Sequence, residues 1–172
     1  MIKFSSALIF TFLCTVFSFS KSNAQSAPVF GLGIVVGQGT THAKGLALGA
    51  DFRFQIRVNE RLYIPITGGF TTIRHQEGVS VFSGKNYRYD SEKYIPLKTG
   101  IKYFFDTPNL GLYGLVEMGI DVYLDVPGGA SGLPLLVSPA MGYTLRNGID
   151  IAILYEGAAR KNYAGIRVGY GF

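Results

Sequence analysis

Apolar and polar residues alternate with a period of two along the chain from residue 29 onward. Successive side chains of a β-strand point to opposite faces, so this period is typical of strands and not of helices. Residues that favour turns divide the pattern into separate stretches. The pattern predicts strands at 29–38, 45–58, 62–75, 94–105, 111–124, 133–146, 149–157 and 162–172.

The connections between these strands alternate between short and long along the chain. The tight turns fall at 59–60, 106–109 and 146–148, and the other connections at 39–44, 76–93, 125–132 and 158–161. Barrels of the outer membrane have tight turns at one end and longer loops at the other, whereas a soluble sandwich has no reason to alternate. The expected fold is therefore an all-β, eight-stranded antiparallel up-and-down transmembrane β-barrel.

One face of each predicted strand is apolar, and the opposite face combines charge with glycine. In 45–58, for example, Leu48 and Phe52 lie on one face, and Asp51 and Arg53 lie on the other. The glycines of the charged faces are Gly31, Gly33, Gly37, Gly49, Gly69, Gly100, Gly119, Gly142, Gly165, Gly169 and Gly171. Glycine suits the crowded interior of an eight-stranded barrel better than a solvated strand face. We therefore expect the apolar faces to meet lipid and the charged faces to line the lumen.

Aromatic residues gather near the ends of the predicted strands. At the short-turn end they are Phe54, Tyr103, Phe105, Tyr143, Tyr170 and Phe172, and toward the other end Tyr87, Tyr89, Tyr94, Tyr123, Tyr155 and Tyr163. Membrane barrels carry aromatic girdles at both interfaces. The sequence predicts that these residues form the two girdles.

The inward register contains acidic and basic residues in equal number. They are Asp51, Glu117, Asp121, Asp150 and Glu156, together with Arg53, Arg57, Lys98, Lys102 and Arg167. Buried charges require partners, so a balanced set of this kind predicts an ion-pair network that plugs the lumen. An ion or proton path along the same residues is the alternative interpretation.

Two pairings within this network are predicted from the register. Centring the 106–109 turn near residues 107 and 108 places Lys98 directly opposite Glu117. The long side chain of Arg167 is expected to find Asp150 diagonally within reach on the preceding strand. Space for that side chain is expected beside the glycines of the first strand, which are Gly31, Gly33 and Gly37.

The first 24 residues have the pattern of a secretory signal peptide. Lys3 precedes an apolar stretch at 7–19, and small residues follow at the expected cleavage point between Ala24 and Gln25. The expected division is a signal peptide at 1–24 and an outer-membrane β-barrel domain at 25–172. The single cysteine, Cys14, lies in the signal, so no disulfide is expected in the mature chain.

Composition narrows the classes of function. A length of 172 residues indicates one domain at most, and the formal net charge of +5 is too small for a polybasic nucleic-acid surface. No apolar run long enough for a transmembrane helix follows the signal. We expect a monomer without a cofactor and without a nucleic-acid partner.

The last strand ends on Phe172, and counting back in twos gives Tyr170, Val168 and Ile166. This pattern resembles the C-terminal assembly signal of bacterial outer-membrane barrels, which the barrel-insertion machinery recognises. With the signal peptide and the eight segments, the chain resembles the small OmpA-type or OmpX-like outer-membrane β-barrel family. The LYIPI and YIPLK sequences, at 62–66 and 94–98, are similar to small barrel proteins of Bacteroidetes type. The resemblance implies a location in the bacterial outer membrane, in contact with its lipid.

Three functions remain open at this point. The leading hypothesis is a non-enzymatic barrel with a structural or surface-interaction role, in which a hairpin at 76–93 is available to a partner. The second is an enzyme that modifies lipid A or phospholipid, with His75, Glu77 and Ser80 as its candidate residues; no family motif surrounds them, so no catalytic residue is assigned. The third is a secreted, lipocalin-like soluble barrel. His42 and His75 lack further ligands at useful spacing, so no metal site is expected.

Overall fold

The computed structural model describes residues 30–40, 45–74, 78–79, 86–87, 91–124, 133–158 and 161–172. Its strands are β1 (Phe30–Gly39), β2 (Leu46–Arg57), β3 (Leu62–Ile73), β4 (Gly78–Val79), β5 (Asn86–Tyr87), β6 (Glu92–Phe104), β7 (Gly111–Tyr123), β8 (Leu135–Thr144), β9 (Ile149–Ala158) and β10 (Lys161–Gly171). Apart from β4 and β5, each strand has 10 to 13 residues, which is long enough to cross a bilayer at the tilt usual in barrels.

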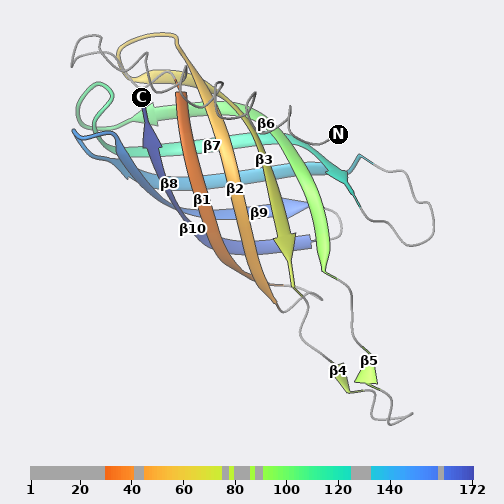
Figure 1. The fold of residues 1–172 in the computed structure, drawn as a ribbon. Helices are drawn as coiled ribbons and strands as arrows, with labels where there is room; N and C mark the ends of the chain where they lie inside the picture. Colours follow the sequence, from red (N-terminus) through yellow and green to blue (C-terminus); the bar gives the residue numbers. More distant parts are fainter. Residues whose placement is uncertain are drawn as a thin grey trace, which may run out of the picture.

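Eight of these strands form a closed barrel in the order β1-β10-β9-β8-β7-β6-β3-β2. Neighbouring strands are antiparallel, and β1 closes the barrel against β10 from Gly31↔Gly171 to Gly39↔Tyr163. Figure 1 shows the first and last strands of the barrel side by side, with the strands tilted around a common axis. The predicted eight-stranded antiparallel barrel is therefore confirmed.

Every predicted segment corresponds to one barrel strand, with differences of a few residues at the ends. β6 begins at Glu92, and β8 begins at Leu135. Between β3 and β6, the short strands β4 and β5 pair through Gly78↔Tyr87 and Val79↔Asn86. Figure 1 shows this small hairpin projecting beyond the barrel.

The alternation of connection lengths is less regular than expected. β9 ends at Ala158 and β10 begins at Lys161, so only residues 159–160 separate them. This connection lies at the same end as the long 74–91 connection, yet it is shorter than the turns at the opposite end. The connections at 58–61, 105–110 and 145–148 lie at one end of the barrel, which we call the turn end. The opposite end, with the 74–91 and 159–160 connections, is the loop end.

The turn between β6 and β7 is centred one residue later than predicted. Thr107 bridges to Leu110, and Asn109 has a φ of 66°, in the left-handed region. This centre places Lys98 opposite Gly119, with Glu117 opposite Gly100 instead. The predicted direct opposition of Lys98 and Glu117 is therefore wrong, because the turn type sets the register of a hairpin.

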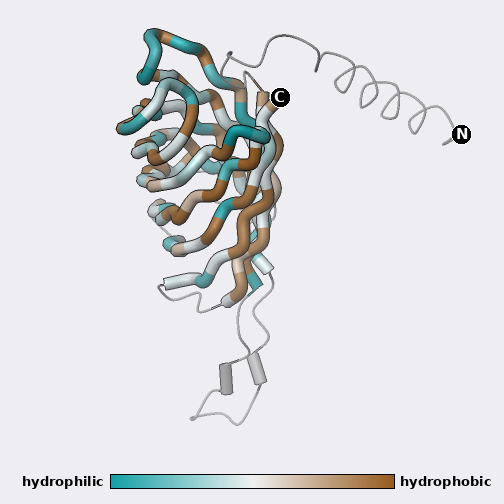
Figure 2. The backbone as a smooth tube through the Cα atoms, turned by 90° about the vertical axis from the view of Figure 1, so that its left-hand side faces the viewer, coloured by the Kyte–Doolittle hydropathy of each residue, from teal (hydrophilic) through white to brown (hydrophobic). Residues whose placement is uncertain are grey.

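The two faces of the strands have the predicted orientation. Apolar side chains such as Ile34 and Ile153 point outward and are 60% and 63% exposed, whereas Glu117 and Arg167 are buried inside. Figure 2 shows hydrophobic and hydrophilic residues alternating along the barrel strands. This orientation is the opposite of the one that the lipocalin-like alternative requires. Within the described ranges, no helix is long and apolar enough to cross a membrane.

Candidate functional site

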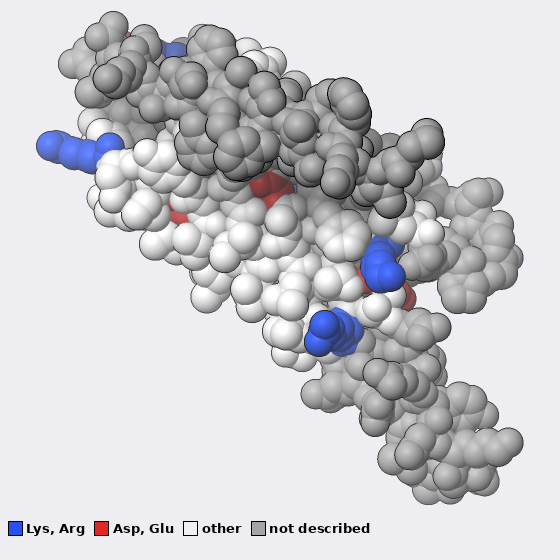
Figure 3. Space-filling model, in the orientation of Figure 1, with Lys and Arg blue, Asp and Glu red and all other residues white. Residues whose placement is uncertain are grey.

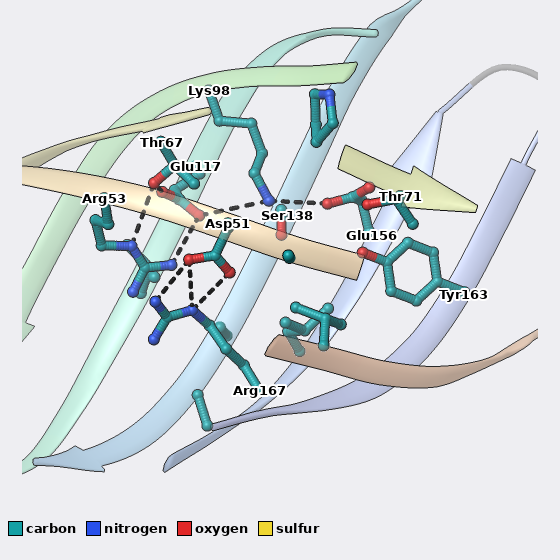
Figure 4. A pocket seen from close by; sticks show the side chains of 17 residues that line it. Asp51, Arg53, Thr67, Thr71, Lys98, Glu117, Ser138, Glu156, Tyr163 and Arg167 are labelled. Atoms are coloured by element: carbon teal, nitrogen blue, oxygen red, sulfur yellow. Dashed lines mark hydrogen bonds and ion pairs between the residues drawn. The ribbon is translucent and has the colours of Figure 1, made fainter. Parts of the chain in front are cut away.

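The middle of the lumen is filled by an ion-pair cluster that joins four strands. Lys98 on β6 places its Nζ 2.8 Å from Glu156 Oε2 on β9 and 3.7 Å from Glu117 Oε2 on β7. Glu117 also accepts a hydrogen bond of 2.5 Å from Thr67 Oγ1, and Arg53 Nη2 on β2 lies 3.5 Å from its Oε2. Figure 4 shows these side chains converging from opposite walls of the barrel. The cluster therefore provides the carboxylate of Glu117 with two cations and one hydroxyl donor, from β6, β2 and β3.

A second cluster connects the last strand to β2 and β9. Arg167 on β10 donates from Nε and Nη2 to Asp51 on β2, with distances of 2.8 Å to Oδ2 and 2.6 Å to Oδ1. Its Nη1 donates to Asp150 Oδ1 on β9 at 2.8 Å. The Asp150 contact is the one expected from the sequence. A forked guanidinium–carboxylate pair of this kind combines charge with directional hydrogen bonds.

Two glycines make room for Arg167, Gly33 and Gly169; a Cβ added at Gly169 meets Arg167 Nη1 at 2.5 Å. A Cβ added at Gly33 meets Arg167 Nη2 at 2.5 Å. At Gly31 and Gly37 the nearest atoms are instead the carbonyl oxygens of Tyr170 and Ala164. The expectation that all three glycines accommodate this side chain therefore holds for Gly33 alone.

Toward the turn end, Asp150 collects three further donors. Lys102 Nζ lies 3.3 Å from Asp150 Oδ2, Tyr113 Oη donates to Oδ1 at 2.8 Å, and Thr144 Oγ1 donates to Oδ2 at 2.8 Å. Lys102 Nζ also lies 3.8 Å from the centroid of the Tyr113 ring and 4.8 Å from that of Phe104. The ammonium group is therefore held by a carboxylate and by two aromatic faces.

Nine of the ten residues predicted for the lumen lie inside the barrel. They are Asp51, Arg53, Lys98, Lys102, Glu117, Asp121, Asp150, Glu156 and Arg167. Arg57 is the exception and is a correction to the prediction: it is the last residue of β2, is exposed, and donates from Nε to Asn59 O at 3.3 Å. Its register faces inward, but at the barrel's end its long side chain turns toward the 58–61 turn.

Several aromatic residues predicted for the girdles lie inside the lumen instead. Tyr94 and Tyr163 are buried in a cluster with Val35, Ala47 and Ile73, and Tyr123 packs against it. By contrast, Tyr103, Phe105, Tyr143, Tyr155 and Tyr170 are exposed on the outer face, as a girdle requires. Position near a strand end did not distinguish the two groups, whereas the parity of each residue within its strand does. The side chains of Tyr87 and Tyr89 lie outside the described residues.

Two small cavities open into the network. One is lined by residues that include Asp51, Lys98 and Glu156 and has a volume of about 20 Å³; the other, near Gln55 and Lys102, has a volume of about 20 Å³ as well. A volume of this size holds about one water molecule. Neither cavity has room for an ion with its hydration shell.

Sequence reasoning missed the neutral partners of these charges. Thr67, Tyr113 and Thr144 are buried in the lumen and donate to the carboxylates. Their signal was present, because each has the inward parity of its strand.

Among the described residues, no three His, Cys, Asp or Glu side chains come together as a metal site. His42, His75, Glu77 and Ser80, and the cleavage site at Ala24 and Gln25, lie outside the described residues.

Comparison with known proteins places this architecture. No protein-family model matches the sequence, and no curated protein matches it either. Among solved structures, the N-terminal β-barrel domain of Pseudomonas aeruginosa OprF matches with a TM-score of 0.53 at 13% identity, covering 86% of this chain and 100% of that one. The Yersinia pestis outer membrane protein Ail, in a phospholipid bilayer nanodisc, matches with a TM-score of 0.52 at 17% identity, covering 83% and 98%. This chain has the fold of a small outer-membrane β-barrel.

A de novo designed transmembrane β-barrel has the same fold, with a TM-score of 0.56 at 14% identity over 86% of this chain and 98% of the designed one. At these identities the likeness concerns the fold. In this barrel the outer surface is apolar, and ion pairs are buried in the interior.

Proposed function

We propose that this protein is a non-enzymatic barrel of the bacterial outer membrane, with a closed lumen and a structural or surface-interaction role. The observation that carries the proposal is the lumen network. Arg53–Glu117, Lys98–Glu156 and Arg167–Asp51 are ion pairs between strands that are not neighbours in the barrel. Arg53–Glu117 and Lys98–Glu156 join strands three positions apart in the barrel and so cross the lumen, where a conducting pore needs space for water and ions.

The energetics of the buried charges support the same conclusion. A charge taken out of water is costly unless a partner and further hydrogen bonds compensate it. Arg167 has two carboxylate partners, and Glu117 has a hydroxyl donor in addition to its two cations. An open, water-filled channel would hydrate these groups and would not need such partners. The network therefore favours a plug over an ion path.

The outer surface and the termini support the membrane location. Exposed apolar side chains surround the barrel, and the outward register of β10 contains Ile166, Val168 and Tyr170 of the C-terminal motif. In the proposed pathway, residues 1–24 direct export, and the barrel-insertion machinery recognises the motif that ends at Phe172. The mature chain is then a monomer in outer-membrane lipid, with the 76–93 hairpin at the loop end available to a surface partner.

Planar-bilayer recording tests the closed lumen. The refolded protein is expected to show no steady conductance, while its changed gel mobility after boiling reports that the barrel is closed and inserted. The Arg53→Ala/Glu117→Ala variant is the comparison, because it widens the lumen while removing both members of a pair. Conductance that rises in this variant supports the proposal, whereas steady conductance by the unmodified protein overturns it.

Membrane fractionation tests the proposed location, and lipid analysis tests the proposal that the protein is not an enzyme. The protein is expected in the outer-membrane fraction, extracted only with detergent; recovery as a soluble protein would contradict the location. Mass spectra of lipid A and phospholipid from cells with and without the protein are expected to be the same. A new deacylated or acylated species would show that the protein is an enzyme.

A further inference from the structure

Two basic side chains lie next to each other on the outer surface, at the loop end of β3 and β6. Arg74 directly follows β3, and Lys93 is near the start of β6; both are exposed. The register pairs Thr72 with Lys93 and Ile73 with Glu92, so Arg74 is the diagonal neighbour of Lys93. Diagonal neighbours on one face of a sheet lie roughly 7–8 Å apart, which two long side chains easily bridge.

These charges begin where the apolar outer surface ends. On β3 the outward register runs through the exposed Ile66 and Phe70 before it reaches Arg74. On β6 it runs from Lys93 through Ile95 to the exposed Leu97. Figure 3 shows basic side chains at this end of the barrel, beside the uncharged surface of the strands. The position at which the apolar residues give way to Arg74 and Lys93 corresponds to the boundary between acyl chains and headgroups in a membrane.

The two charged residues are fixed to the barrel wall. The backbone N–H of Arg74 donates to Leu46 O at 3.0 Å, and that of Leu124 donates to Lys93 O at 3.0 Å. The flanking Leu46 and Leu124 side chains are exposed apolar groups. The basic pair is therefore presented by rigid strand ends above an apolar surface, and not by a free loop.

Ser91 adds a hydroxyl group near Arg74 and Lys93. Extending the register by one residue beyond the Ile73–Glu92 pair places Ser91 opposite Arg74, and alternation would place Ser91 on the same outward face as Lys93. A guanidinium, an ammonium and a hydroxyl are all donors, and together they match the oxygens of a phosphate group. Glu92, between Ser91 and Lys93, belongs to the opposite face of the strand.

Two exposed basic residues also lie at the turn end. Arg57 Nε donates to Asn59 O at 3.3 Å, and Arg61 Nη1 donates to Phe105 O at 3.4 Å. Their guanidinium groups are thus used to hold the 58–61 turn. They supply a matched pair of exposed positive charges for a control.

We propose that Arg74, Ser91 and Lys93 form a binding site for the phosphate group of a lipid headgroup, in the membrane leaflet at the loop end. The acyl chains of that lipid lie along the apolar outer surface next to Phe70 and Leu97. The inference rests on the membrane location proposed above and deepens it, because it names the lipid chemistry and the residues that recognise it.

Native mass spectrometry of the refolded barrel in detergent, titrated with phosphatidic acid or phosphatidylcholine, tests this site. The unmodified protein and the Arg57→Gln/Arg61→Gln control are expected to retain phosphatidic acid in preference to phosphatidylcholine. The Arg74→Gln/Lys93→Gln variant is expected to retain it about thirtyfold less well, on the scale of two charges at an anionic surface. Ser91→Ala is expected to cause a smaller loss in the same direction.

Equal retention by the unmodified protein and Arg74→Gln/Lys93→Gln would overturn the site. An equal loss in the two double variants would do so as well, because it would indicate general charge attraction. Competition by millimolar inorganic phosphate as effective as that by the lipid would show an anion site without lipid recognition. Flotation with liposomes tests the membrane location separately: a barrel that fails to insert, yet retains phosphatidic acid through Arg74 and Lys93, contradicts only the proposed location.

Discussion

Arg167 reaches over Gly33 to bind Asp51, two strands away in the barrel. The guanidinium on β10 contacts both carboxylate oxygens of Asp51 on β2, with a shortest distance of 2.6 Å, and β1 lies between these strands. Gly33 is paired with both Gly169 and Asp51 in the sheet, and its missing side chain leaves the path open. The contact therefore clamps the seam at which the first and last strands close the barrel.

Gly33→Ala is expected to destabilise the folded barrel by about 1–3 kcal/mol, the usual cost of added volume in a packed interior. The new methyl group occupies the position at which Arg167 Nη2 now lies, so the forked pair with Asp51 has to break or shift. Equilibrium urea unfolding in lipid or detergent measures the change in the free energy of unfolding.

Gly68→Ala is the matched control for this substitution. A Cβ at Gly68 meets only Leu97 Cδ2, at 3.6 Å, which is an ordinary contact. In an Arg167→Met background, Gly33→Ala is expected to lose most of its effect. A full cost that persists without Arg167 would show that Gly33 is needed for some other reason.

Lys98 is expected to couple more strongly to Glu156 than to Glu117. Its Nζ is 2.8 Å from Glu156 Oε2 but 3.7 Å from Glu117 Oε2, and Coulomb attraction weakens with distance. Double-mutant cycles with Lys98→Met, Glu156→Gln and Glu117→Gln, measured by urea unfolding, give the two coupling energies. Loss of one member of a buried pair typically costs about 3–5 kcal/mol, so the single changes are measurable. A stronger coupling to Glu117 would contradict the arrangement.

Deletion of Phe172, or Phe172→Ala, is expected to reduce the amount of assembled barrel in the outer membrane. Its ring packs against Tyr170 at a centroid distance of 5.2 Å, at the end of the proposed assembly signal. Phe105→Ala is the control, because Phe105 packs similarly against Tyr103 at 5.6 Å, away from the C-terminus. Heat-modifiable protein in membrane fractions is the measurement. Normal assembly of the Phe172 variants would remove the recognition role of the motif.

The mature protein is expected to begin at Gln25. Cleavage after Ala24 follows from the small residues at the end of the apolar stretch at 7–19. N-terminal sequencing, or the intact mass of protein extracted from the outer membrane, checks the cleavage site. Finding Met1 on the outer-membrane form would contradict export through a cleaved signal.

Alternation determined which residues of a strand share a face, and the glycines on the charged faces assigned those faces to the lumen. The Cβ atoms of a strand alternate between two faces, so one correctly placed residue assigns all the others in that strand. This is why Asp51, Arg53 and Glu117 were correctly placed inside, and why the apolar faces were correctly placed outside. Tyr94 and Tyr163 were assigned by their nearness to strand ends instead, and they were misplaced.

Apart from the predicted Arg167–Asp150 contact, only the tertiary structure decided which charges meet. With Asn109 in the left-handed conformation, the β6–β7 turn is centred one residue later than expected. Lys98 and Glu117 are therefore diagonal neighbours and not a directly opposite pair. Closure of the barrel then brought Lys98 on β6 to Glu156 on β9, and Arg167 on β10 to Asp51 on β2. A sequence pattern defines a side chain's direction from its own strand, whereas a partner across the lumen depends on the curvature and stagger of all eight strands together.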